Sequence, residues 1–129
     1  MSSILNYKAS DLLKYIGSGS SLLVVVVLLL IASNVFMSFA WYHHLKNPSM
    51  PFITALGISL IYVIFEYTCN IHANELGYSR YSLYTLKIMQ EAITLCVFMA
   101  FAFYIFDEKP TYKHLASFGL ILGATALAF

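Results

Sequence analysis

Three charged residues lie within otherwise apolar stretches of the sequence. Lys87 and Glu91 lie four residues apart in "SLYTLKIMQEAITLCVFMAFAFYIF", and Glu66 lies in "PFITALGISLIYVIFEYTCNI". Residues at positions i and i+4 share one face of a helix, so the ammonium and the carboxylate of the first stretch can pair. Two carboxylates then share one ammonium, and burial favours the neutral form of the carboxyl group that is left over. This pattern indicates a site for a proton, a cation or a small polar substrate.

The cost of these charges in a membrane predicts where their side chains point. Each ionised residue at a bilayer centre costs about 2.5–3.5 kcal/mol on insertion scales. We therefore expect all three to face a bundle interior and to contact one another in one polar seam. A rise of ~1.5 Å per residue places Glu66 and Lys87 at one depth, roughly 7–8 Å from the same membrane face, with Glu91 a turn deeper. The polar residues expected to bind substrate or proton beside them are Asn34, Tyr62, Asn70 and Gln90.

The same three charges also have a purely structural interpretation. Paired charges inside a membrane protein can fix the register of its helices without moving a solute. The functional interpretation follows from the rule that intramembrane charges mark substrate and ion pathways. The spacing alone leaves both interpretations open.

Other kinds of site lack the residues that they require. No serine, cysteine or histidine constellation suggests a nucleophile and its base, and no glycine-rich phosphate loop occurs. Cys69 and Cys96 show no metal-ligand spacing and fall at different depths of their apolar segments. We predict no catalytic residue, no metal and no cofactor, and so no enzyme. The formal net charge of +1 and the absence of a basic cluster give no reason to expect a nucleic-acid partner.

The elements that must position the charges are long apolar helices. Hydrophobic residues make up 60% of the chain and charged residues 10%, against about 45–50% and about 25% in soluble domains. A span needs roughly 20 apolar residues, and the last segment reaches that length only if its helix begins near Thr111, after Pro110. We predict an all-α membrane protein with a four-helix transmembrane domain over residues 21–129. The four apolar segments cover residues 21–42, 52–71, 82–106 and 115–129.

Residues 1–20 precede these segments and have a different pattern. Their apolar residues recur at helical spacing up to a Gly-Ser-Gly-Ser run, which predicts a short amphipathic helix on the membrane surface. A targeting extension and a Gly-Ser run of non-native origin stay open as alternatives. Lysine and arginine are balanced at three on each face, so the sequence does not fix the orientation of the spans.

The last apolar segment carries Gly119 and Gly123 at the centre of a stripe of small residues. This spacing lets two helix backbones approach closely. A homodimer contact and tight packing within one subunit are both compatible with it.

Four stretches resemble a family of small bacterial-type membrane proteins: "SNVFMSFAWYHHLK", "FEYTCNIHANELGY", "LKIMQEAITLCVF" and "FDEKPTYKHLASFGLILGA". This uncharacterised four-helix family is assigned to the drug/metabolite transporter superfamily, and the resemblance covers about residues 30–129. The last stretch is also similar to small multidrug resistance transporters. The resemblance implies a bundle in which helices one to three surround a chamber and the fourth mediates dimerisation.

The sequence departs from small multidrug resistance transporters in the position of its charged residues. Small multidrug resistance transporters place their essential glutamate in the first helix, whereas residues 21–45 contain no carboxylate here. Their antiport mechanism is therefore not carried over. Glu75 also stands where the family pattern predicts a basic residue.

The leading hypothesis is a small multi-pass transporter, dimeric through its fourth helix, in which Glu66, Lys87 and Glu91 form a charged site. The alternative is a non-transporting structural or accessory subunit of a larger membrane complex. Either would reside in a bacterial-type inner membrane or an organelle membrane. The substrate and the coupling ion are not predicted.

Overall fold

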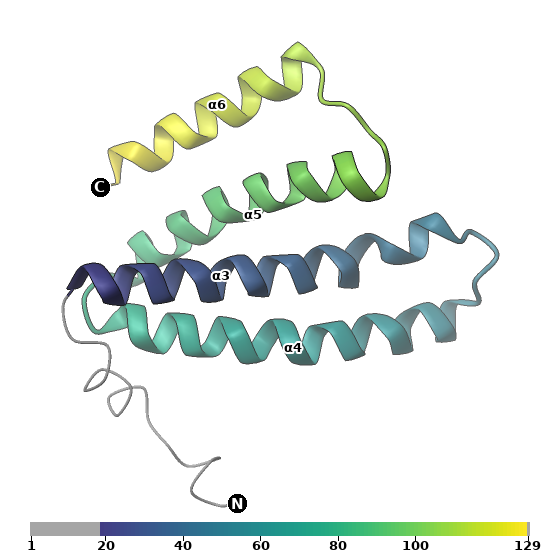
Figure 1. Cartoon of the computed structure of the whole chain (residues 1–129), viewed down its shortest axis with the longest axis horizontal. Coiled ribbons are helices and arrows are strands. Elements are labelled where there is room, and N and C mark those ends of the chain that lie inside the picture. The colour runs from purple at the N-terminus through teal and green to yellow at the C-terminus, as the bar shows by residue number, and fades with distance from the viewer. Residues whose placement is uncertain (1–18, 129) are drawn as a thin grey trace, which may run out of the picture.

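The computed structural model of the protein describes residues 19–128, so the predicted leader lies outside the described residues except for its last two positions. Within this range the chain forms four α-helices and a short 3-10 helix and contains no strand (Figure 1). The elements are α3 (Gly19–Tyr42), η1 (His43–Lys46), α4 (Phe52–Tyr78), α5 (Leu83–Ile105) and α6 (Tyr112–Leu127).

The helices confirm the predicted class, an all-α membrane protein. Three stretches, Ser21–Lys46, Phe52–Tyr78 and Leu83–Ile105, are long and apolar enough to cross a bilayer, with hydropathies of 2.7, 1.7 and 1.8. Helix α6 has 16 residues and is about 24 Å long, whereas the hydrocarbon core is ~30 Å thick. Its role as a fourth span therefore stays a prediction.

Hydrogen-bonded caps fix where the last two helices begin. The Ser82 side chain accepts a hydrogen bond from the Thr85 N–H at the start of α5. At α6 the Thr111 hydroxyl accepts from the His114 N–H, and His114 Nδ1 accepts from the Thr111 N–H. Such reciprocal bonds satisfy donors that the first turn of a helix leaves unpaired. The predicted start of the last helix near Thr111 is confirmed.

Helix α4 is longer than the sequence predicts. Its apolar stretch suggests an end at Ile71, but the helix continues for seven residues to Tyr78. The added segment is partly polar yet keeps helical hydrogen bonding, because the loss of hydropathy does not end a helix. This extension changes the depth of every residue counted from that end.

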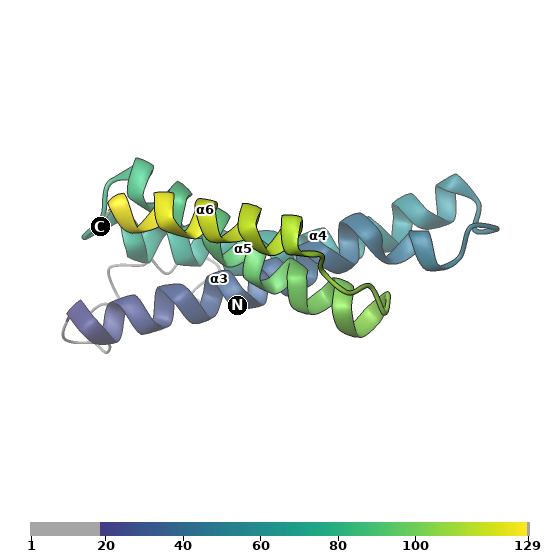
Figure 2. The ribbon, with the colours of Figure 1, turned by 90° about the horizontal axis from the view of Figure 1, so that it is seen from above.

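Helix α3 lies between α4 and α5, and α6 lies beyond α5 (Figure 1). Helices α3 and α4 run antiparallel side by side, whereas α3 and α5 cross at an angle (Figure 2). The expectation that the second and third spans face each other along their charged faces is therefore wrong. Their main shared neighbour is α3.

The apolar core lies at the end where α3 begins and α4 ends. At the same end of the bundle, α4 approaches α5 at Gly77, where an added Cβ would lie 2.5 Å from Leu86 Cδ2. Only glycine permits this contact without displacing the leucine side chain. The buried core cluster consists of Leu22, Val26, Leu30, Ala73, Leu76 and Met89.

Candidate functional site

Glu66 is a buried carboxylate near the middle of α4. The residue is only 5% exposed and lies at the interface with α3. Ser33 Oγ of α3 donates a hydrogen bond to Glu66 Oε1 at 3.3 Å, and Asn70 Nδ2 donates to the same oxygen at 3.1 Å. Both donors are neutral groups, so they stabilise the carboxylate without cancelling its charge.

The hydrogen bonding continues along α4 as a ladder of amides. Asn74 Nδ2 donates to Asn70 Oδ1 at 2.6 Å, and Asn70 in turn donates to Glu66. The three residues recur at i, i+4 and i+8 and therefore share one face of the helix. Each amide donates in the direction of the carboxylate, so the aligned dipoles favour negative charge on Glu66. We call Glu66, Asn70 and Asn74 the amide ladder.

A second polar cluster joins α3 to α5. Thr94 Oγ1 donates to Asn34 Oδ1 at 2.6 Å, and Asn34 Nδ2 donates to the Leu30 carbonyl oxygen at 2.7 Å. The Ser38 hydroxyl donates to the backbone carbonyl of Asn34 at 2.9 Å. Asn34 is 1% exposed, as is its neighbour Ser33. The two clusters therefore meet at adjacent positions of α3, in the centre of the bundle.

Lys87 and Glu91 form an ion pair on the outer face of α5. The distance from Lys87 Nζ to Glu91 Oε1 is 3.0 Å, and their side chains are 66% and 54% exposed. The hydrogen bonds that Glu66 accepts come instead from Ser33 and Asn70. The predicted arrangement, in which both carboxylates share the Lys87 ammonium, is not the one observed.

Glu66 and Lys87 lie at different depths, counted from the ends of their helices, and this explains why they do not form the predicted seam. Glu66 lies twelve residues before the end of α4 at Tyr78, which is about 18 Å at ~1.5 Å per residue. Lys87 lies four residues after the start of α5 at Leu83, which is about 6 Å. The prediction of equal depth is therefore wrong. Asn74, four residues before Tyr78, is the α4 residue at the depth of Lys87.

A groove connects the two parts of the site. It has a volume of about 450 Å³ and lies at the end of the bundle near the α4–α5 loop. Asn74, the outer end of the amide ladder, lines it together with the predicted site residues Lys87 and Gln90. The remaining lining residues are Leu83, Tyr84 and Leu86. Buried Glu66 is thus linked by Asn70 and Asn74 to an open groove that contains the lysine.

The predicted residue Tyr62 lies on the opposite side of Glu66, one helical turn toward the start of α4. Its ring stacks on Phe39 with a centroid distance of 5.5 Å. Phe39 also contacts Phe101 of α5 edge to face at 5.1 Å. We call Phe39, Tyr62 and Phe101 the aromatic layer.

Ser33 and Asn74 were not predicted as site residues. Asn74 continues the spacing of Glu66 and Asn70 by one further turn, so the sequence contains a signal for it. Ser33 has no such signal, because its role depends on which face of α3 meets α4. Thr94 lies four residues after Gln90, on the polar side of α5, but its partner on α3 follows only from the packing.

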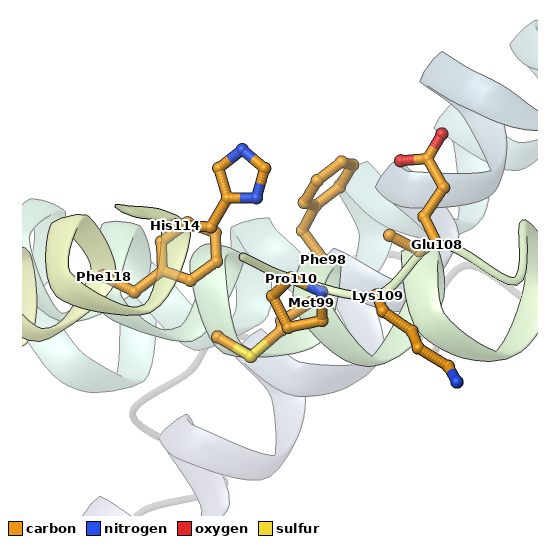
Figure 3. A pocket seen from close by; sticks show the side chains of 8 residues that line it. Phe98, Met99, Glu108, Lys109, Pro110, His114 and Phe118 are labelled. Atoms are coloured by element: carbon orange, nitrogen blue, oxygen red, sulfur yellow. The ribbon is translucent and has the colours of Figure 1, made fainter. Parts of the chain in front are cut away.

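A separate pocket of about 190 Å³ lies beneath the start of α6 and is built from residues of α5, α6 and their connecting loop. Figure 3 shows that Glu108 and Lys109 extend to opposite sides of this loop. His114, also at this pocket, accepts the hydrogen bond that caps α6. The residues that line this pocket belong to neither of the polar clusters around Glu66. Among residues 19–128 no group of three or more histidine, cysteine or acidic residues is arranged to hold a metal ion.

Helix α6 packs mainly along α5 and has no buried residue within the described part of the chain. An added Cβ at Gly119 or Gly123 would meet no atom within 4 Å. These glycines therefore do not mediate tight packing within the subunit. The other interpretation of their spacing, contact with a second helix from outside, stays a prediction.

Comparison with known proteins identifies one family. A family model described as "Putative member of DMT superfamily (DUF486)" matches residues 26–129. No curated protein and no solved structure matches the chain.

Proposed function

Since the chain belongs to the family described in those words, we propose that it is a small membrane transporter of the drug/metabolite type in which Glu66 binds a proton or a small cation. This is a transport function and not an enzymatic one. It needs a group that binds and releases a solute within the membrane, and Glu66 meets that requirement best.

The observation that carries the proposal is a buried carboxylate with neutral partners. Glu66 is 5% exposed, and its Oε1 accepts hydrogen bonds from Ser33 and Asn70. We assign the proton or cation to the second carboxylate oxygen, Oε2. An ionised carboxylate at this depth costs a few kcal/mol, which the two neutral donors offset in part. Binding of a positive charge offsets the remainder, and this is what favours loading of the site.

The groove supplies a second set of binding groups in this proposal. Lys87, Glu91 and Gln90 lie at or beside it and offer an ammonium, a carboxylate and an amide to a polar solute. Asn34 and Tyr62 lie deeper and flank Glu66 from α3 and from the next turn of α4. We propose that they shape the site and that Glu66 carries the exchangeable charge.

We further propose that α6 pairs with a second copy of the chain. Its exposed glycines allow a close approach of two identical helices, and van der Waals contact at small residues drives helix association in bilayers. An accessory role in a larger complex is the alternative, because an exposed α6 also offers a surface to a foreign partner. Purification in a mild detergent separates the two: a homodimer supports the transporter, and a stoichiometric foreign protein supports the accessory role.

Solute flux into proteoliposomes tests the function. The Glu66→Gln protein keeps the side-chain volume and loses the charge, so we expect proton or cation flux to fall by about tenfold or more. Glu75→Gln is the matched control, because Glu75 is an exposed residue of the same helix. Flux that is equal in the Glu66→Gln and Glu75→Gln proteins would remove Glu66 from the mechanism.

A further inference from the structure

The two directions leading away from Glu66 along the bundle are chemically different. Toward the α4–α5 loop, the next two turns of α4 carry Asn70 and Asn74, which continue the hydrogen bonding to the groove. Toward the α3–α4 connection, the next turn carries Tyr62, which belongs to the aromatic layer. One side therefore offers polar groups to water, and the other offers ring faces.

The aromatic layer contains one ring from each of the three long helices. Phe39 of α3 stacks on Tyr62 of α4 and contacts Phe101 of α5, which is only 7% exposed. Packed rings exclude water, and constrictions lined by apolar groups act as barriers because they dewet.

We propose that, in the conformation described, Glu66 is reached from the α4–α5 loop face, through Asn74 and Asn70, and that the aromatic layer must open before a solute leaves by the other face. This rests on the proposed function of Glu66 and adds a route and a barrier to it. Asn74 is the positioning residue at the mouth of the route, since it belongs both to the amide ladder and to the groove.

The chemistry of amides defines what Asn70 and Asn74 do. A side-chain amide donates through its NH₂ and accepts through its carbonyl oxygen, but it has no readily exchanged proton to pass on. The ladder therefore solvates the Glu66 charge and does not conduct protons by itself. A proton or cation reaches Glu66 with water that replaces the hydrogen bond from Asn74 to Asn70, so Asn74 acts as a gate.

Thiol labelling from each membrane face tests this route. Ser33→Cys places a small thiol next to Glu66, in a protein that also carries Cys69→Ala and Cys96→Ala. A membrane-impermeant cationic methanethiosulfonate reagent is added to sealed vesicles of each orientation. Arg80→Cys and Ser49→Cys, at exposed positions of the two opposite loops, report the orientation and the maximal labelling rate at each face.

We expect the Ser33→Cys protein to be labelled from the Arg80 face about tenfold faster or more than from the Ser49 face. Adding Asn74→Leu should alter labelling from the Arg80 face, and adding Tyr62→Ala should allow labelling from the Ser49 face. Asn70→Cys is a second reporter if Ser33→Cys impairs folding. Equal labelling from both faces, faster labelling from the Ser49 face, or no labelling of either reporter would overturn the proposed route.

Labelling does not require transport, so the two proposals fail separately. One-sided labelling of Ser33→Cys together with unchanged flux in Glu66→Gln contradicts the function and retains the route. Loss of flux in Glu66→Gln with labelling from both faces contradicts the route and retains the function.

Discussion

Glu66 and Glu91 are two glutamates on spans that are consecutive in the sequence, and their surroundings are opposite in kind. Glu66 is buried between α3 and α4 and accepts hydrogen bonds from a hydroxyl and an amide. Glu91 lies on the outer face of α5, half exposed, with Lys87 Nζ at 3.0 Å. Among residues 19–128 no ammonium pairs with the deeper carboxylate, whereas Lys87 pairs with the shallower one.

This difference supports our proposal that Glu66, and not Glu91, exchanges a positive charge. The Lys87 ammonium already neutralises Glu91, so binding of a further cation gains little there. The partners of Glu66 leave its charge in place, because neutral dipoles stabilise a carboxylate without cancelling it. The site with the weaker electrostatic compensation is therefore the better candidate for a solute that must bind and leave.

The largest expected effect is a difference in unfolding free energy between alanine substitutions at Glu66 and at Glu91. Glu66→Ala removes the acceptor of Ser33 and Asn70, and buried donors without partners cost about 1–3 kcal/mol of unfolding free energy. Glu91→Ala should cost less than about 1 kcal/mol, because exposed ion pairs contribute little. Thermal unfolding in detergent, followed by circular dichroism, measures both. Equal losses of stability would remove the distinction between the two sites.

A smaller effect is expected from breaking the middle of the amide ladder. Asn70→Leu removes a donor to Glu66 and an acceptor for Asn74, which should lower the unfolding free energy by about 1 kcal/mol. The matched substitution Gln90→Leu alters a residue that lines the groove and should change stability by less. A larger loss for Gln90→Leu than for Asn70→Leu would show that the ladder does not stabilise the bundle. The same unfolding assay gives both values.

The smallest effect concerns the interaction between Lys87 and Glu91. A double-mutant cycle with Lys87→Met and Glu91→Gln should give a coupling energy of about 0.3–0.5 kcal/mol, the range for i, i+4 pairs on exposed helix faces. High salt should reduce it further. A coupling energy several times larger would indicate that the pair is buried in the assembled protein, which would sharpen the role of the second copy.

Composition and apolar length were enough to predict the helical membrane class, and Pro110 with Thr111 was enough to place the start of α6. The end of α4 was misplaced because hydropathy indicates where apolar residues stop, whereas backbone hydrogen bonding continues to Tyr78. That difference of seven residues moved Glu66 away from the depth of Lys87. Helix ends read from hydropathy are therefore poor reference points for depth.

The division of the polar seam could not be predicted, because spacing along a helix does not state which neighbour its face meets. Glu66 and Asn70 share one face of α4, and Lys87 and Glu91 share one face of α5, as their spacing requires. The placement of α3 between α4 and α5 then separates the two faces. Ser33 became a partner of Glu66 only through this order of helices.

Infrared difference spectroscopy of the reconstituted protein tests the central claim, that Glu66 is the group that takes up the positive charge. A carboxylic acid absorbs differently when it is protonated, ionised or bound to a cation, so a step in proton or cation concentration produces a carboxyl band. We predict that this band disappears in the Glu66→Gln protein and persists in the Glu91→Gln protein. A band that persists in Glu66→Gln, or that disappears in Glu91→Gln, would contradict the account.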